Sequence, residues 1–325
     1  MDKVMVTGGN GFIGSNFIHH MVKKYPSIKI LNIDCLTYAA CPKALDDVHQ
    51  VETIQYDIAS TSGNLERLVD QFEPEWVVHF AAESHVDNSI KNPNAFFRTN
   101  VEGTLNLLNV LVGARHKPWL LHISTDEVYG SLALGDDPDN KDSFAEHDPI
   151  EPNSPYAASK AAAEAFVHAY GATFQLPYII SRSSNNYGPF QHPEKFISKT
   201  ITNALQDKPI PVYGQGINER DWIYVEENCQ ALSTLIEYGL PGDVYNIGGN
   251  RAVNNLFVVK TILAILEKPE SLIKFVADRP GHDLKYKVST YKMETLGWFP
   301  QMAMLNGLEK TCRWFRDNEW FWRKA

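Results

Sequence analysis

Short hydrophobic runs alternate with longer segments of helical periodicity through the first half of the chain. The runs cover residues 4–6, 28–33, 76–80 and 119–124. Uninterrupted apolar runs of this length are typical of strands buried on both faces of a parallel sheet. Helical spacing of apolar residues extends over 12–24, 65–72, 94–112 and 156–174. This alternation predicts right-handed crossovers and a Rossmann-type α/β fold with a doubly wound parallel sheet.

The second half is less regular, because proline and glycine interrupt it repeatedly between Pro189 and Gly249. It predicts a smaller domain. The run 243–247 has the character of one more buried strand that returns to the main sheet. We therefore expect interleaved domains, the first built from residues 1–180 and about 221–248, the second from residues 181–220 and 249–325.

Charge and cysteine content limit the possible partners. Thirty Lys and Arg against 39 Asp and Glu give a net charge of −9 without a basic cluster, so nucleic acid is not expected as a partner. No apolar run approaches the ~20 residues that span a bilayer, and Met1 leads almost directly into the first strand. The cysteines at 35, 41, 229 and 312 form no Cys-x-x-Cys pair. We expect a cytoplasmic protein without membrane contact, disulfide or metal.

A glycine triplet follows the first strand directly. Gly8, Gly11 and Gly14 are spaced by three and lead into the helix that begins near Phe12. In a dinucleotide site such glycines allow the tight turn, the approach of the pyrophosphate and close helix packing. A structural turn can also produce the triplet, but its place between strand and helix favours a dinucleotide.

Asp34 ends the second strand, 20 residues after Gly14. At this position an acid accepts hydrogen bonds from the adenosine ribose, and its charge favours NAD over NADP. A capping role is the alternative for Asp34 alone. Asp57, near the end of another expected strand, could reach the adenine or could equally be a cap.

Tyr156 and Lys160 lie four residues apart in a helical stretch and therefore share one helix face. To accept a proton near neutral pH, a tyrosine must have its pKa lowered by about three units, which costs about 4 kcal/mol. A cation at ~4 Å in an effective dielectric of ~20 supplies about that amount. After a dinucleotide motif, the pair predicts a catalytic base and its activating ammonium.

Two adjacent carboxylates, Asp126 and Glu127, follow the strand that ends near Ser124. Such strand ends face the ligand crevice of an α/β sheet. The alternative is a solvated acidic loop. Neighbouring carboxyl groups can divide the roles of acid and base when their environments separate their pKa values.

With these motifs, the chain resembles the nucleotide-sugar 4,6-dehydratase branch of the extended short-chain dehydrogenase/reductases. Further marks of the resemblance extend over nearly the whole chain, at residues 36–39, 81–87, 124–130, 184–189, 193–195, 220–222 and 278–283. Within the branch, the chain is most similar to enzymes that act on dTDP-glucose. Three positions differ from their usual pattern: Cys35 stands for Lys, Ala40 for Gly and Asn88 for Arg. Asn88 is similar to the enzymes that act on UDP-glucose.

The resemblance implies roles for individual residues. The catalytic set is Thr125, Asp126, Glu127, Tyr156 and Lys160. The NAD site comprises Gly8, Gly11, Phe12, Ile13, Gly14, Asp34, Cys35, Leu36, Thr37, Asp57, Ile58, Phe80, Ala81, Ala82, Ser84, Thr99, Tyr156, Lys160 and Asn186. The sugar nucleotide is bound by Ser84, Thr125, Asn185, Lys195, Phe196, Pro211, Val212, Tyr213, Arg220, Asn255, Arg279 and His282. Surface salt bridges are the alternative for each arginine, and core or pocket hydrogen bonding is expected for His79, His85 and His122.

The expected reaction is NAD-dependent dehydration of a nucleoside-diphospho-hexose. Tyr156, helped by Lys160 and Thr125, takes the C4 hydroxyl proton as hydride passes to NAD. Glu127 removes the C5 proton while Asp126 protonates the departing C6 hydroxyl, and the hydride returns to C6. dTDP-glucose is the expected substrate, with UDP-glucose or UDP-N-acetylglucosamine as alternatives. A 4-epimerase and a non-catalytic dinucleotide sensor are the rival functions. A homodimer is expected through the helices at 94–112 and 156–174.

Overall fold

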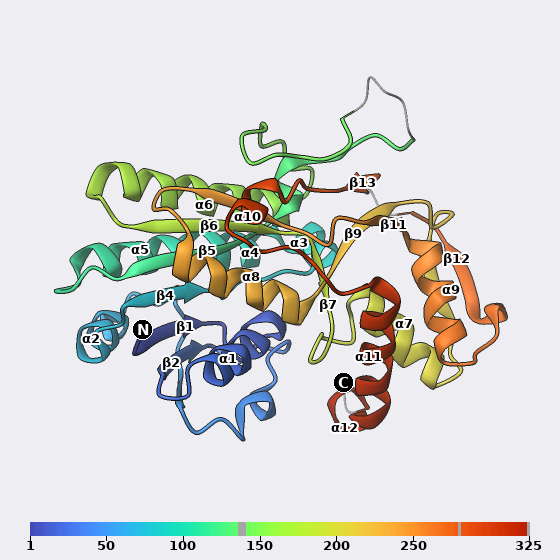
Figure 1. The fold of residues 1–325 in the computed structure, drawn as a ribbon, viewed down its shortest axis with the longest axis horizontal. Coiled ribbons are helices and arrows are strands. Elements are labelled where there is room, and N and C mark those ends of the chain that lie inside the picture. The colour runs from blue at the N-terminus through green and yellow to red at the C-terminus, as the bar shows by residue number, and fades with distance from the viewer. Residues whose placement is uncertain (136–140, 279–280, 324–325) are drawn as a thin grey trace.

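The computed structural model describes residues 1–135, 141–278 and 281–323, and its main feature is a seven-stranded parallel sheet (Figure 1). The strand order is β10-β6-β5-β4-β1-β2-β3. The strands are β1 (Lys3–Thr7), β2 (Lys29–Asp34), β3 (Val51–Gln55), β4 (Trp76–His79), β5 (Trp119–Thr125), β6 (Tyr178–Ser183) and β10 (Val244–Ile247). Every adjacent pair is parallel. The prediction of a Rossmann-type sheet is confirmed, including the late return of the strand at 244–247 beside β6.

Helices cover both faces of this sheet. On one face lie α1 (Phe12–Lys24) and α8 (Val225–Tyr238). On the other lie α2 (Asn64–Phe72), α5 (Gly103–Gly113) and α6 (Pro155–Phe174). Alternate strand residues supply the two cores, since Val4 and Val6 pack on one face and Met5 on the other. The uninterrupted apolar runs of the sequence are therefore explained by burial on both faces.

The segment expected as one helix at 94–112 is not uniform. It consists of α4 (Pro93–Phe96), a π-helical segment, η2 (Phe97–Glu102), and α5. The prediction of regular helical spacing is therefore wrong in the middle of this segment. The wide turn contains Asn100, whose side chain bonds the backbone of Glu83, and π-helical turns of this kind frequently occur at functional sites.

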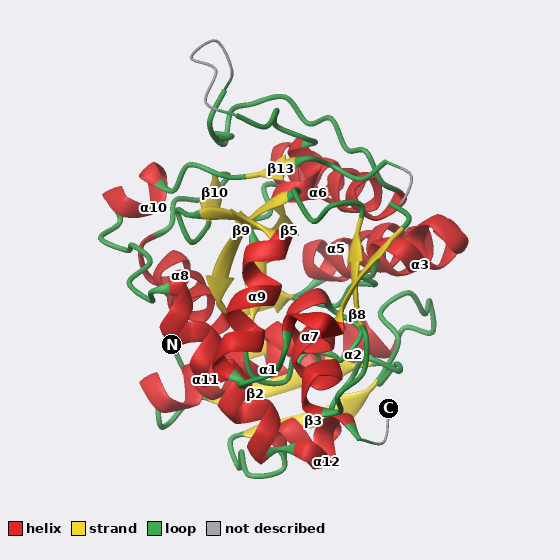
Figure 2. Cartoon of the chain, turned by 90° about the vertical axis from the view of Figure 1, so that its right-hand side faces the viewer, coloured by secondary structure: helices red, strands yellow, loops and turns green. Residues whose placement is uncertain are grey.

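A second group of elements lies beyond the carboxyl ends of the sheet strands, at the right of Figure 1 and facing the viewer in Figure 2. Its strands are β7 (Asn185–Tyr187), β9 (Glu219–Tyr224), β11 (Ala252–Asn254) and β13 (Lys285–Tyr286), and the separate pair β8 (Ile210–Tyr213) and β12 (Ile273–Val276). Its helices are α7 (Phe196–Leu205), α9 (Asn255–Ile265), α11 (Met304–Asp317) and α12 (Glu319–Trp322). They share an aromatic and aliphatic core of their own. The domain boundaries given above remain predictions.

Several shorter helices complete the fold. They are η1 (Pro42–Leu45), α3 (Val86–Lys91), η3 (Asp126–Tyr129), η4 (Glu270–Leu272) and α10 (Tyr291–Thr295). Within the described ranges, no helix combines the length and the apolar character needed to span a membrane. All four cysteines are free.

Candidate active site

The glycine loop after β1 has no room for side chains at two of its three positions. Gly8 has a positive φ of 76°, and a Cβ there would lie 2.6 Å from the backbone nitrogen of Ala81. A Cβ at Gly14 would lie 2.3 Å from the carbonyl oxygen of Gly8. Gly11 has only that same oxygen nearby, at 3.2 Å. The loop thus combines a tight turn, close helix packing and an open glycine at the start of α1, a combination that fits a pyrophosphate.

Asp34, at the end of β2, is held by two backbone donors. The amide of Asn10 donates to Oδ2 at 2.9 Å and the amide of Leu36 donates to Oδ1 at 2.8 Å. Burial raises the pKa of Asp34, and these two hydrogen bonds oppose the rise. The carboxylate therefore lies fixed beside the glycine loop, and each oxygen retains acceptor capacity for a ribose hydroxyl.

The other residues expected at the NAD site lie mainly around the carboxyl edge of the large sheet. Phe12 and Ile13 form the first turn of α1, residues 35–37 follow β2, residues 80–82 follow β4, Thr99 lies in the π-helical segment and Asn186 lies in β7. Asp57 fits its capping alternative, because it accepts from the amide of Ala59 at 2.9 Å and pairs with Arg98 at 2.7 Å. Ile58 packs in the core against Gly103.

Tyr156 and Lys160 lie on α6, one turn apart as predicted. Ser154 caps this helix by accepting from the amide of Ala157, and Pro155 occupies its first position. Burial and the charges of Glu127 and Asp126 raise the pKa of Tyr156, while a hydrogen bond with Thr125 opposes the rise. In the chain alone the net shift of the Tyr156 pKa is therefore upward, and the lowering expected from Lys160 together with the positive nicotinamide stays a prediction. Burial lowers the pKa of Lys160 itself to about 8, so its ammonium loses its proton as the pH rises through that value.

The two carboxylates lie on η3, the short turn after β5. Thr125 caps the turn by accepting from the amide of Glu127 at 3.3 Å, and it also donates to Oδ1 of Asp126 at 3.3 Å. Asp126 is buried, and burial followed by the charges of Glu127 and Asp221 raises its pKa well above the ordinary value. The raised pKa of the buried Asp126 beside the less buried Glu127 is compatible with the expected separation of acid and base, which stays a prediction.

Residues expected at the sugar (Ser84, Asn185), at the nucleotide (Lys195) and at the cofactor (Asn186) lie near these carboxylates. Lys195, just before α7, donates to the carbonyl of Ser84 at 2.7 Å and to its hydroxyl at 3.2 Å. Burial lowers the pKa of Lys195, and Glu194 and Glu127 oppose this. The buried side-chain oxygens of Asn185 and Asn186 have no hydrogen-bond partner among the described residues. These unused acceptors at the crevice suit a ligand rich in hydroxyl groups.

The residues expected at the nucleotide lie in the second group of elements. Arg220 in β9 is buried, stacks 4.2 Å above the ring of Tyr286, and donates to the carbonyl of Asp283 at 2.9 Å. Its alternative as a surface salt bridge is therefore wrong. His282 pairs with Asp278 at 2.6 Å and lies against Tyr213. The further expected contacts are Phe196 at the start of α7, Pro211 and Val212 in β8, and Asn255 at the start of α9. Arg279 lies outside the described residues.

Of the three histidines, His79 fits the expectation best. It bonds Thr7 at 2.6 Å and Thr104 at 2.9 Å. The expected hydrogen bonding is wrong for His122, because both of its buried ring nitrogens lack a partner among the described residues. His85 lies 3.8 Å from Glu194. Within the described part of the chain, no group of three or more possible ligands could hold a metal ion.

Sequence reasoning missed several buried polar residues behind the site. The Asn100 side chain joins the backbone of Glu83 to Ser159 on α6, with the Ser159 hydroxyl at 2.8 Å. A second set, centred on Arg182 and Glu164, joins α6 to β6. The available signal was polarity at positions where the helical or strand pattern calls for apolar residues.

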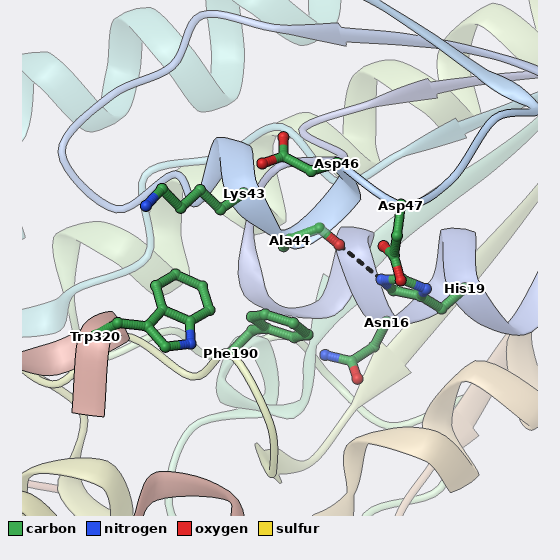
Figure 3. A pocket seen from close by; sticks show the side chains of 8 residues that line it. All are labelled: Asn16, His19, Lys43, Ala44, Asp46, Asp47, Phe190 and Trp320. Atoms are coloured by element: carbon green, nitrogen blue, oxygen red, sulfur yellow. Dashed lines mark hydrogen bonds between the residues drawn. The ribbon is translucent and has the colours of Figure 1, made fainter. Parts of the chain in front are cut away.

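A separate cleft of about 370 Å³ lies on the outer side of α1 (Figure 3). Asn16 and His19 of α1, Lys43 of η1, Phe190 and Trp320 of α12 line it. Two of its polar groups already have partners within the chain: His19 bonds the carbonyl of Ala44 at 2.7 Å, and the ammonium of Lys43 lies 5.5 Å from the centre of the Trp320 ring. This cleft contains none of the expected catalytic residues.

The chain matches the family described as GDP-mannose 4,6 dehydratase over residues 5–311. It is 43% identical over 348 residues to the dTDP-glucose 4,6-dehydratase of Neisseria meningitidis serogroup B, a comparison that covers 100% of this chain and 96% of that protein. It is similar to the crystal structure of a dTDP-glucose 4,6-dehydratase from Streptomyces venezuelae with NAD and TYD bound, with a TM-score of 0.93, 40% identity and 99% of each chain covered.

A protein with the rival 4-epimerase activity has a similar fold. A UDP-glucose 4-epimerase of Thermus thermophilus, solved with NAD, has a TM-score of 0.88, 28% identity, and coverage of 97% of this chain and 99% of that chain. Overall shape is therefore shared by both activities, and the side chains at the site must distinguish them.

Proposed function

The chain belongs to the family described as GDP-mannose 4,6 dehydratase, and on that premise we propose that it is an NAD-dependent hydro-lyase converting dTDP-glucose to the 4-keto-6-deoxy sugar. Relatives named for this activity cover the whole chain. The glycine loop and Asp34 fit NAD, because Gly8 and Gly14 exclude any Cβ and Asp34 is a fixed acceptor beside them. The chemistry that NAD supplies when bound is reversible hydride acceptance, first from C4 and finally returned to C6.

In the oxidation half, Tyr156 accepts the proton of the C4 hydroxyl. Its raised pKa means that it needs positive charge nearby before it can act as a base. Lys160, one helical turn away, and the oxidised nicotinamide supply that charge. Thr125 stabilises the phenolate through its hydrogen bond.

In the elimination half, Glu127 accepts the C5 proton, which the 4-ketone has made acidic, and Asp126 gives a proton to the departing C6 hydroxyl. The observation that carries this proposal is the buried Asp126 with its raised pKa beside Glu127 and Tyr156. A 4-epimerase removes no water and has no use for such an acid, and a non-catalytic sensor needs none of these groups.

Product analysis by mass tests the proposal. Purified protein should convert dTDP-glucose to a product lighter by one water, with no added cofactor, because the hydride returns within each cycle. UDP-glucose and UDP-N-acetylglucosamine, run in parallel, should react at least tenfold less efficiently, about 1.4 kcal/mol of discrimination. A product of unchanged mass would overturn the dehydratase in favour of the epimerase.

We further propose a cytoplasmic homodimer. Free thiols at all four cysteines suit a reducing compartment. Three large apolar side chains are exposed on neighbouring helical segments: Ile90 (43%), Phe97 (54%) and Phe166 (36%). Burial against a second copy would remove them from water. A monomeric mass in light scattering at micromolar concentration would contradict the dimer. Neither nucleic acid nor a membrane is proposed as a partner.

A further inference from the structure

A buried ion pair joins α6 to β6 behind the catalytic residues. Arg182 of β6 is 5% exposed and Glu164 of α6 is 3% exposed. The guanidinium donates to Glu164 through Nη2 at 2.7 Å and through Nε at 3.1 Å. Glu164 lies four residues after Lys160, so the pair anchors the helix one turn beyond the catalytic lysine. A charge pair this deeply buried persists only when its other hydrogen bonds are also satisfied.

The remaining donors of Arg182 extend this pair to the acid turn. Its Nη1 donates to the hydroxyl of Tyr129 at 2.7 Å, and the guanidinium carbon lies 4.7 Å from the centre of the Tyr129 ring. Tyr129 is the last residue of η3, two positions after Glu127. Its hydroxyl in turn donates to the side chain of Asn246 in β10 at 2.8 Å. One phenol therefore connects η3 to two strands of the large sheet and, through Arg182, to α6.

The two elements that this network joins are supported very differently. Helix α6 has 20 residues, and it contributes Val167 to the core of the sheet. Turn η3 has four residues. A four-residue turn has little internal hydrogen bonding of its own, so its position depends on what holds its two ends. Strand β5 and Thr125 hold the first end. At the second end Val128 and the Tyr129 ring pack with Val288, the amide of Glu151 donates to the carbonyl of Val128 at 3.0 Å, and the Tyr129 hydroxyl adds the hydrogen bonds to Arg182 and Asn246.

We propose that Tyr129, held by the Arg182–Glu164 pair, is a positioning residue that sets Asp126 and Glu127 against the sugar while Tyr156 and Lys160 act from α6. This inference rests on the proposed dehydratase. It predicts that loss of the Tyr129 hydroxyl displaces the turn and leaves the helix in place. The elimination half of the reaction then slows more than the oxidation half.

The test is Tyr129→Phe in the full-length protein loaded with NAD. This change keeps the ring between Phe144, stacked at 5.0 Å, and the guanidinium, and it removes only the hydroxyl. We expect turnover of dTDP-glucose to fall roughly tenfold or more. Reduced nicotinamide should form at nearly the parental rate on mixing with substrate and should accumulate to a higher steady-state fraction, because its consumption depends on elimination.

The matched control is Tyr178→Phe. Tyr178 is also buried and also joins β6 to α6, through a 2.8 Å hydrogen bond between its hydroxyl and His168, but it lies at the opposite end of the strand from the site. The control should leave the fraction of reduced cofactor unchanged even if it lowers thermal stability. Equal effects of the two changes, or equal slowing of oxidation and elimination in Tyr129→Phe, would overturn the proposal.

A second variant removes the charge behind the phenol. Glu164→Gln keeps a hydrogen-bond acceptor for Arg182. Because Glu164 also raises the pKa of Lys160, the variant is assayed below the pH at which Lys160 loses its proton, and there it should raise the fraction of reduced cofactor in the same direction as Tyr129→Phe. If it unfolds the protein, Tyr129→Phe alone decides. If the unmodified protein fails to eliminate water from dTDP-glucose, the proposed function is refuted. If it eliminates water normally and Tyr129→Phe leaves the fraction of reduced cofactor unchanged, only the positioning role is refuted.

Discussion

Two parts of the site carry the two halves of the chemistry on very different supports. Tyr156 and Lys160 project from a capped 20-residue helix that packs across the sheet. Asp126 and Glu127 lie on a four-residue turn at the end of β5. The helix is held over several turns by both apolar packing and buried polar contacts, whereas the turn depends on its two ends and on a small apolar cluster formed by Val128, Tyr129 and Val288.

This difference shows how one fold can host more than one reaction. On the proposed function, the helix provides the base and the ammonium for oxidation of a sugar hydroxyl, and the fold that carries them is shared with a UDP-glucose 4-epimerase. The turn adds an acid and a second base, with the pKa of Asp126 raised chiefly by burial. The activity is thus set where a short, replaceable segment meets a rigid scaffold.

The largest expected effect is at the helix. Tyr156→Phe removes the base for the C4 hydroxyl and should lower kcat about 10³–10⁴-fold, the upper part of what general base catalysis contributes. No reduced nicotinamide should appear on mixing with dTDP-glucose, which absorbance measures directly. Formation of reduced cofactor at the parental rate would show that another group takes the proton.

At the turn, Glu127→Gln should cost roughly 10²–10³-fold in turnover, because a base for the C5 proton is lost but oxidation remains possible. In contrast to Tyr156→Phe, reduced nicotinamide should form and persist. Asp126→Asn is the companion change, and it should stall at the same stage because a neutral amide cannot protonate the C6 hydroxyl. If either variant fails before oxidation, the assignment of this turn to elimination is wrong.

The sequence predicted where the candidate residues lie better than it predicted their pKa values. Tyr156, Lys160, Asp126 and Glu127 were singled out as candidates because their spacing or their place at a strand end has a direct geometric meaning. The rise in the pKa of Tyr156 that burial causes in the chain alone was not predicted, because a count of nearby charges ignores the cost of burial. Burial depends on contacts that are remote in sequence, and no local pattern reports it.

The fold was predicted in the same uneven way. Five of the seven parallel strands were predicted from short apolar runs, including the one at 243–247 that returns to the sheet, whereas β3 and β6 were not. The π-helical segment at 97–102 was missed, since it changes the hydrogen-bonding step without changing the hydrophobic pattern enough to notice. The Arg182–Glu164 pair was missed for another reason: its members are 18 positions apart on different elements.

The pH dependence of oxidation tests the role of Lys160 on the helix. Burial lowers the pKa of Lys160 to about 8, so the ammonium that Tyr156 needs is lost as pH rises through that value. In a Glu127→Gln background, where elimination is blocked, formation of reduced nicotinamide should fall about tenfold per pH unit above the pKa. Lys160→Arg keeps its charge throughout this range, so the oxidation that remains in this variant should not fall with rising pH. If the fall in oxidation with rising pH persists unchanged in Lys160→Arg, a group other than Lys160 causes it.

The smallest expected effect tests whether the helix is as well supported as its packing indicates. Ser154→Ala removes the hydroxyl that accepts from the amide of Ala157 at 3.0 Å, and loss of such a cap costs about 1 kcal/mol of folding free energy. Because Pro155 fixes the first helical φ and the apolar contacts of α6 remain, turnover should change by no more than about twofold. The control is Asn254→Ala. The Asn254 side chain caps α9 by accepting from the amide of Phe257 at 2.7 Å, so its loss should lower the free energy of unfolding in urea by a similar amount. If Ser154→Ala reduces oxidation more than Tyr129→Phe reduces elimination, the helix is the weaker support, and the contrast between the two halves is reversed.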